Sequence, residues 1–108
     1  MYREEIKVID CTVRDGGLMN KWQFSDTFVR HVYNSLADAA VDYMEIGYLS
    51  SANAFDPKEF GAWKFCHEKD LKKIIGEGEK RIKLSAMADI GRINMDDIPM
   101  AEDSSLDM

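Results

Sequence analysis

Three short runs of apolar residues stand out along the chain, at residues 6–11, 43–48 and 82–89. Each run is nearly continuous in apolar character and contains β-branched or aromatic side chains, which is typical of a strand that is covered on both faces. One acidic residue, Glu45, interrupts the second run. The pattern therefore predicts three strands.

Between these runs, the apolar residues recur with the spacing of a helix. An apolar residue recurs every four positions from residue 28 to residue 40, and Ser25 precedes this stretch as a candidate N-cap. Residues 57–76 predict a second helical stretch in two pieces, which Gly76 would end as a C-terminal cap. The spacing therefore predicts one helix between the first two strands and helical structure before the third.

The other segments are weakly patterned. Residues 12–24 follow neither period and include two adjacent glycines, so they predict a long loop. The acidic tail, residues 95–108, predicts at most a fourth strand that begins near Leu106. The alternation of strand and helix implies parallel strands joined by right-handed crossovers, and hence an α/β fold of the barrel or doubly wound kind.

Composition and charge narrow the possible partners. The chain has 108 residues, enough for one domain, with 20 acidic and 14 basic side chains and a formal net charge of −6. This balance lacks the positive surface that nucleic acid or an anionic membrane requires. The sequence has no apolar stretch of membrane-spanning length and no apolar signal-peptide core at its start, so we expect a cytoplasmic protein.

The cysteines and histidines give little support for a metal site. Cys11 and Cys66 are far apart and form no Cys-X-X-Cys pair, so we expect buried thiols in a reducing compartment. His31 and His67 fall in predicted helical segments without the spacing of zinc ligands. A metal bound here would need carboxylate oxygen ligands.

The carboxyl ends of the predicted strands carry the candidate chemistry, because ligands of parallel α/β sheets bind at that edge. Arg14 and Asp15 follow the first strand, Glu45 lies near the end of the second, and Asp89 ends the third. A carboxylate in a covered strand needs a cationic partner, and Arg14 is the nearest candidate for Glu45. Asp15 offers oxygen ligands to magnesium or manganese, and Arg14 offers a planar fork to a developing oxyanion.

The same residues also allow a plainer interpretation. Residues 15–17 could form only a turn, Arg14 could lie on the surface, and Glu45 could face water from an edge strand. The spacing of these residues does not by itself decide between the two.

The residues around these positions resemble a known superfamily. Residues 10–16, Asp-Cys-Thr-Val-Arg-Asp-Gly, followed by residues 44–48, Met-Glu-Ile-Gly-Tyr, are similar to the first two strand ends of the DRE-TIM metallolyases. This group includes 4-hydroxy-2-oxovalerate aldolase, hydroxymethylglutaryl-CoA lyase and the carboxyltransferase domains of pyruvate carboxylases. The resemblance implies a (β/α)₈ barrel that makes or breaks carbon–carbon bonds next to a carbonyl, through a metal-bound enolate.

The resemblance also implies roles for individual residues. Asp15 would be a ligand of a divalent cation, Mn or Mg, Arg14 would stabilise the enolate, and Glu45 would hold Arg14. The substrate would be a 2-oxo acid or related acyl compound. Apart from the resemblance, we also expect a homo-oligomer. Candidate substrate contacts are Gly16, Asn20 and Asp89.

Two departures from the superfamily qualify this expectation. A complete barrel takes roughly 250 residues, so residues 1–108 would be the amino-terminal part of the catalytic domain, with three to four parallel strands. The late His-X-His metal ligands of the superfamily have no counterpart in these residues, so we expect the chain alone to be inactive. Leu18 stands where related aldolases carry an acid–base histidine.

Two alternatives remain open. The chain could be a non-catalytic α/β binding module with an acidic, metal-binding pocket built from Asp10, Asp15 and Asp89. It could instead be an assembly element, because an open parallel sheet exposes strand edges and apolar faces that favour dimerisation.

Overall fold

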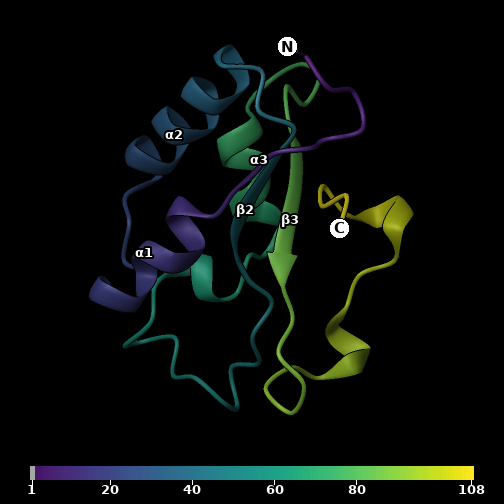
Figure 1. The fold of residues 1–108 in the computed structure, drawn as a ribbon. Helices are drawn as coiled ribbons and strands as arrows, with labels where there is room; N and C mark the ends of the chain where they lie inside the picture. Colours follow the sequence, from purple (N-terminus) through teal and green to yellow (C-terminus); the bar gives the residue numbers. More distant parts are fainter. Residues whose placement is uncertain (1) are drawn as a thin grey trace.

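The protein is an α/β domain built on a small parallel sheet. The computed structural model describes residues 2–108. The strands pair in the order β1-β2-β3, and both pairs are parallel, which confirms the predicted α/β class (Figure 1). The bounds of the strands are Ile9–Asp10 for β1, Tyr43–Tyr48 for β2 and Lys83–Met87 for β3.

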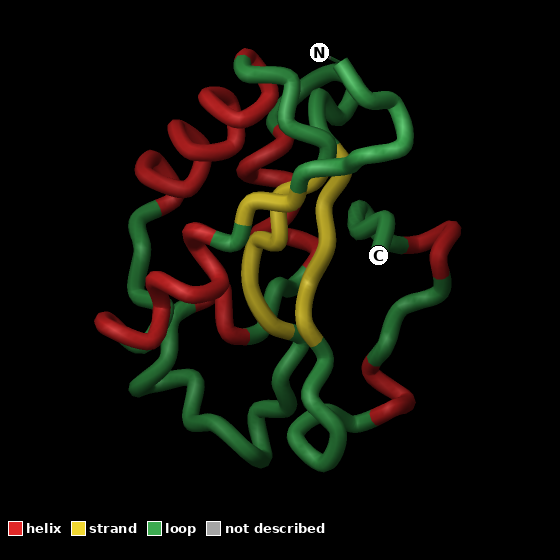
Figure 2. The backbone as a smooth tube through the Cα atoms, in the orientation of Figure 1, coloured by secondary structure: helices red, strands yellow, loops and turns green. Residues whose placement is uncertain are grey.

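Residues 2–108 also form three α-helices and three short 3-10 helices, of which η2 and η3 follow β3. Helices α2 and α3 contact each other, and Figure 2 shows the helices in red around the central strands. No helix among residues 2–108 has both the length and the apolar character needed to cross a bilayer. The bounds are Thr12–Asn20 for α1, Asp26–Asp38 for α2, Ala62–Lys64 for η1, Glu68–Ile75 for α3, Met95–Asp97 for η2 and Ala101–Asp103 for η3.

The core lies between the sheet and the helices α2 and α3. The strand residues Met44, Ile46 and Leu84 are fully buried, and helix residues one turn apart pack with them in the same cluster. Burial of large apolar side chains is the main stabilising contribution to such a domain. The helix residues of this cluster are Val29, Tyr33, Leu71 and Ile74.

The prediction of a loop over residues 12–24 is wrong for Thr12–Asn20, which form α1. The Asp10 carboxylate, just before the N-cap residue Cys11, accepts hydrogen bonds from the backbone N–H of Thr12 at 3.0 Å and from its hydroxyl at 2.8 Å. Val13 and Gly17, one turn apart, are the buried residues of α1. Two glycines lower helix propensity, so contacts with the rest of the domain determine this helix.

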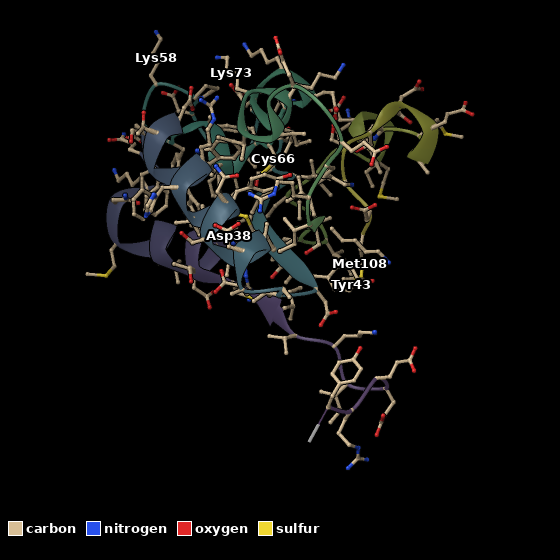
Figure 3. All side chains as sticks on the ribbon, turned by 90° about the horizontal axis from the view of Figure 1, so that it is seen from above. Asp38, Tyr43, Lys58, Cys66, Lys73 and Met108 are labelled. Carbon is tan, nitrogen blue, oxygen red and sulfur yellow. The ribbon has the colours of Figure 1, made fainter. Side chains whose placement is uncertain are left out.

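Other predicted bounds also change. The first strand is shorter than residues 6–11, because β1 is an edge strand, and Figure 3 shows the preceding segment extending away from the domain. Within residues 57–76 only η1 and α3 are helical, and Gly76 ends α3 as predicted. The Ser25 cap is confirmed, since its Oγ accepts from the N–H of Phe28 at 3.1 Å.

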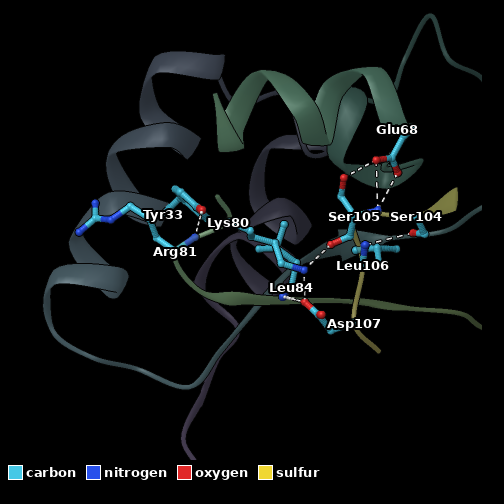
Figure 4. Close-up of polar contacts among 9 residues, drawn as sticks. All are labelled: Tyr33, Glu68, Lys80, Arg81, Leu84, Ser104, Ser105, Leu106 and Asp107. Atoms are coloured by element: carbon cyan, nitrogen blue, oxygen red, sulfur yellow. Dashed lines mark hydrogen bonds and ion pairs between the residues drawn. The ribbon is translucent and has the colours of Figure 1, made fainter. Parts of the chain in front are cut away.

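The tail returns to the sheet beside β3. The Met108 N–H donates to the Leu84 carbonyl at 3.3 Å, and the Ala86 N–H donates to the Met108 carbonyl at 3.0 Å. This is the hydrogen-bond pattern of a parallel pair, although the structure assigns no strand to the segment predicted to begin near Leu106. Side chains fasten the tail as well, because Glu68 accepts from Ser105 and Asp107 accepts from Leu84 and Lys80 (Figure 4).

Removal of the Asp107 charge should make the free energy of unfolding less dependent on pH in the acidic range. Burial favours the neutral acid, but the hydrogen bonds from Lys80 and from the Leu84 N–H outweigh it and lower the pKa of Asp107. The carboxylate therefore stabilises the fold above the ordinary aspartate pKa of about 4, and this contribution is lost as pH falls through the lowered folded value. We expect Asp107→Asn to cost about 1 kcal/mol at neutral pH, with the difference from wild type shrinking in acid. Urea unfolding at a series of pH values measures it, and a constant difference would contradict the assignment.

Candidate functional site

The predicted ion pair between Arg14 and Glu45 is present just beyond the carboxyl end of β1, beside the middle of β2. Arg14 Nε lies 2.9 Å from Glu45 Oε2, and the two side chains are 21% and 12% exposed. The buried Nε lacks a directed hydrogen bond, so the contact is electrostatic. The first turn of α1 places Arg14 here, and Glu45 lies between the two core residues of β2. The interpretation of Glu45 as a carboxylate facing water is therefore wrong.

Cys11 and Asp15 complete this cluster. The Cys11 thiol donates to Glu45 Oε2 at 3.4 Å, and burial raises the pKa of Cys11, which keeps the thiol protonated as a donor. Asp15 Oδ1 lies 3.5 Å from Arg14 Nε, and its side chain is 63% exposed. Contacts with Cys11, Glu45 and Tyr48 raise the pKa of Arg14, so its charge is permanent. The cluster thus presents a fixed guanidinium beside an accessible carboxylate.

The other predicted site residues lie in different settings. Asn20 is at the far end of α1, where its side chain accepts from the Trp22 N–H at 3.1 Å. Gly16 lies within α1 beside Phe24, and a Cβ there would come 3.3 Å from that ring. Asp89 follows β3, and its charge acts on Lys64. The structure therefore brings Arg14, Asp15 and Glu45 together, and it gives Asn20 a capping contact.

The oxygen ligand that Asp15 offers is of the type that a divalent cation prefers, but one carboxylate is too few to hold the cation. The carboxylate of Asp15 is an accessible hard oxygen donor of the kind that Mg²⁺ and Mn²⁺ prefer. Each oxygen of Asp10 accepts a hydrogen bond from Thr12. Residues 2–108 contain no group of three or more His, Cys, Asp or Glu side chains that could hold a metal ion. Asp15 can therefore supply one ligand, and this part of the chain does not complete a site.

A buried lysine that the sequence reasoning missed lies next to this cluster. Lys64 Nζ is 4.2 Å from the ring centre of Trp22, 3.9 Å from that of Tyr48 and 4.1 Å from that of Phe55. We call these three rings the aromatic cage. They come from three separate segments, so no spacing in the sequence could have revealed it.

Two glycines allow the cage to form. A Cβ on Gly47 would lie 2.0 Å from the Trp63 carbonyl oxygen, so glycine lets η1, which carries Lys64, pack against β2. A Cβ on Gly17 would lie 2.0 Å from the Trp22 indole. The indole in turn donates to the Arg14 carbonyl at 2.9 Å. Trp22 therefore links the cage to the Arg14 cluster.

The cavities of the domain lie apart from the Arg14 cluster. The first, about 360 Å³, opens between α3 and the tail, and its lining includes Cys66, His67 and Leu106 but none of the predicted site residues. Burial raises the pKa of the Cys66 thiol, which makes it an inert core residue. This cavity is therefore separate from the Arg14 cluster.

Comparison of the chain with protein-family models, with curated proteins and with solved structures finds no match.

Proposed function

We propose that this chain is the amino-terminal part of a divalent-metal-dependent aldolase or lyase, which makes or breaks a carbon–carbon bond next to a carbonyl of a 2-oxo acid or acyl substrate. The observation that carries the proposal is the Arg14–Glu45 pair, held beyond the carboxyl end of β1 in a parallel sheet, with Asp15 beside it. The motif resemblance supplies the reaction class. The order β1-β2-β3 and the pairing of the tail with β3 are compatible with the start of a (β/α)₈ barrel.

In this proposal Arg14 stabilises the enolate. The guanidinium is held by Glu45 at its Nε and by contacts with Cys11 and Tyr48, and in this proposal its fixed charge faces a substrate oxygen. Glu45 is a positioning residue, since it fixes the guanidinium without touching substrate. A donor fixed before reaction stabilises developing negative charge without reorganisation, and this is worth several kcal/mol.

Asp15 would hold the cation in this proposal. A divalent cation, when bound, polarises a carbonyl oxygen as a Lewis acid. The exposed carboxylate beside Arg14 is the residue of this chain that fits such a role. Leu18 lies exposed on α1 and has no group that moves a proton, so the acid–base step is not assigned to that position.

Loss of the Asp15 carboxylate should weaken cation binding. We expect Asp15→Ala to lower the Mn²⁺ affinity of the full-length gene product by at least about tenfold, as measured by calorimetric titration. Asp10→Asn is the matched control, because that side chain lies at the same strand end but is hydrogen-bonded to Thr12. Equal Mn²⁺ affinity of Asp15→Ala and wild type would remove Asp15 from the proposed site.

A second candidate function is assembly, with the homo-oligomer expected from the sequence. The observation that favours it is the open edge at β1, where Ile6, Val8 and Ile9 are exposed. Exposed apolar side chains on an edge strand favour pairing with another chain. Assembly and catalysis are compatible, since the Arg14 cluster lies at the end of the strands.

A further inference from the structure

The cavity between α3 and the tail has the position and the size of a ligand site. Residues 49–52, which directly follow β2, and residues from the segment 93–99, which follows β3, line it beside the start of α3. Ligands of parallel α/β sheets bind beyond the carboxyl ends of the strands. The cavity volume of about 360 Å³ lies in the range of roughly 300–1,000 Å³ that is typical of small-molecule sites.

The lining combines a buried apolar floor with polar side chains. Phe65, Cys66 and Leu71 are each at most 6% exposed, so they form the floor. Burial raises the pKa of the Cys66 thiol, and the floor therefore carries no charge. An apolar group that covers this floor is removed from water, which favours binding. The polar side chains of the lining are Ser50, Ser51, His67, Glu68, Asp97 and Ser104.

The two carboxylates of the lining have no cationic partner. Neither Glu68 nor Asp97 forms an ion pair with any of residues 2–108. No lysine or arginine of this part of the chain lines the cavity. Two negative charges around an apolar space attract a cation and repel an anion. The formal net charge of −6 acts in the same direction over a longer range.

Hydrogen bonds from the tail hold the carboxylate of Glu68 in place. The Ser105 N–H lies 3.1 Å from Oε1 and 3.0 Å from Oε2, and the Ser105 hydroxyl donates to Oε1 (Figure 4). A carboxylate has about four lone-pair sites, so Glu68 can also accept from an ammonium group. A side chain that is already ordered loses little freedom on binding. Asp97 is exposed at the end of η2 and lines the same cavity.

We propose that this cavity binds a small organic cation, a primary amine with an apolar body. The ammonium group pairs with Glu68 and Asp97, and the apolar body packs on the floor at Leu71. A bare metal ion fits less well, because residues 2–108 contain no group of three or more side chains that could ligate it. The site is separate from the Arg14 cluster and needs neither the metal nor the reaction of the proposed function.

Benzylamine and benzyl alcohol provide a matched pair of probes. They share the aromatic body, but only the amine carries a positive charge at neutral pH. NMR titrations of the protein that follow the methyl groups of Leu71 and Leu106, both in the lining, measure the two affinities. We expect benzylamine to bind at least about tenfold more tightly than benzyl alcohol.

Removal of either carboxylate charge should weaken binding of the amine alone. We expect Asp97→Asn and Glu68→Gln each to lower the benzylamine affinity about threefold, as for a partly exposed ion pair, and to leave the benzyl alcohol affinity unchanged. Asp96→Asn is the matched control, because Asp96 is an exposed neighbour that does not line the cavity. It changes the net charge equally and should bind benzylamine like wild type.

Three results would overturn the proposal. They are the absence of benzylamine shifts at Leu71 and Leu106, equal affinity for the two probes, and equal effects of Asp97→Asn and Asp96→Asn. The last result would assign the preference to the net charge of the protein rather than to the cavity. If Glu68→Gln does not fold, the exposed pair Asp97→Asn and Asp96→Asn decides. The probes require no turnover, so the outcome is independent of the aldolase or lyase proposal.

Discussion

Substitution of Arg14 by lysine is expected to slow enolisation of pyruvate by about a hundredfold, the typical cost of losing one oxyanion donor. Lysine keeps the positive charge that neutralises Glu45, but it loses the planar fork that can face Glu45 and a substrate oxygen at the same time. The measurement is exchange of the pyruvate methyl protons with D₂O, catalysed by the full-length gene product with Mn²⁺.

Thermal unfolding of the same variant provides the control. Because the charge beside Glu45 is kept, we expect the Arg14→Lys variant to fold and to unfold within a few degrees of wild type. A variant that exchanges slowly because it is unfolded would make Arg14 a structural partner of Glu45, without support for a role in enolisation. A folded variant with the wild-type exchange rate would exclude Arg14 as the donor.

Substitution of Gly17 by alanine is expected to destabilise the domain by about 3 kcal/mol. The new Cβ would lie 2.0–2.2 Å from three atoms of the Trp22 indole. That ring cannot easily move, because it donates to the Arg14 carbonyl and contacts Tyr48 and Lys64. Urea unfolding measures the loss.

Gly16 offers the matched control in the same helix. A Cβ at Gly16 would lie 3.3 Å from the edge of the Phe24 ring, a tight contact that a small shift relieves. Alanine also has the higher helix propensity, by about 1 kcal/mol. We therefore expect Gly16→Ala to stay within about 1 kcal/mol of wild type. Equal destabilisation by the two variants would show that α1 responds to any added methyl group rather than to the Trp22 contact.

The parts of the fold that could be predicted are those with a long, regular pattern. Residues 43–48 and the helix after Ser25 follow from periodicity, because each buries a continuous apolar face. Helix α1 could not be predicted in this way. The interactions that support it, the hydrogen bonds from Thr12 to Asp10 and the contact of Gly17 with Trp22, leave no apolar period in the sequence.

The candidate site also has a part that could be predicted and a part that could not. The Arg14–Glu45 pair could be predicted, since a carboxylate in a covered strand needs a cation and neighbouring parallel strands end at one edge. The aromatic cage could not, because the rings around Lys64 come from three segments and meet only in the folded chain. Asn20 was predicted to contact substrate from a loop. In the structure it lies at the end of α1, where its side chain accepts a hydrogen bond.

The central claim is that Arg14 stabilises the negative charge that develops on a substrate oxygen. Oxalate tests it most directly, because it is a stable analogue of the pyruvate enolate and needs no turnover. Calorimetric titration of the full-length gene product with Mn²⁺ should show that oxalate binds more tightly than pyruvate, and Arg14→Lys should reduce this preference at least about tenfold. An unchanged preference for oxalate in the folded Arg14→Lys variant would contradict the account.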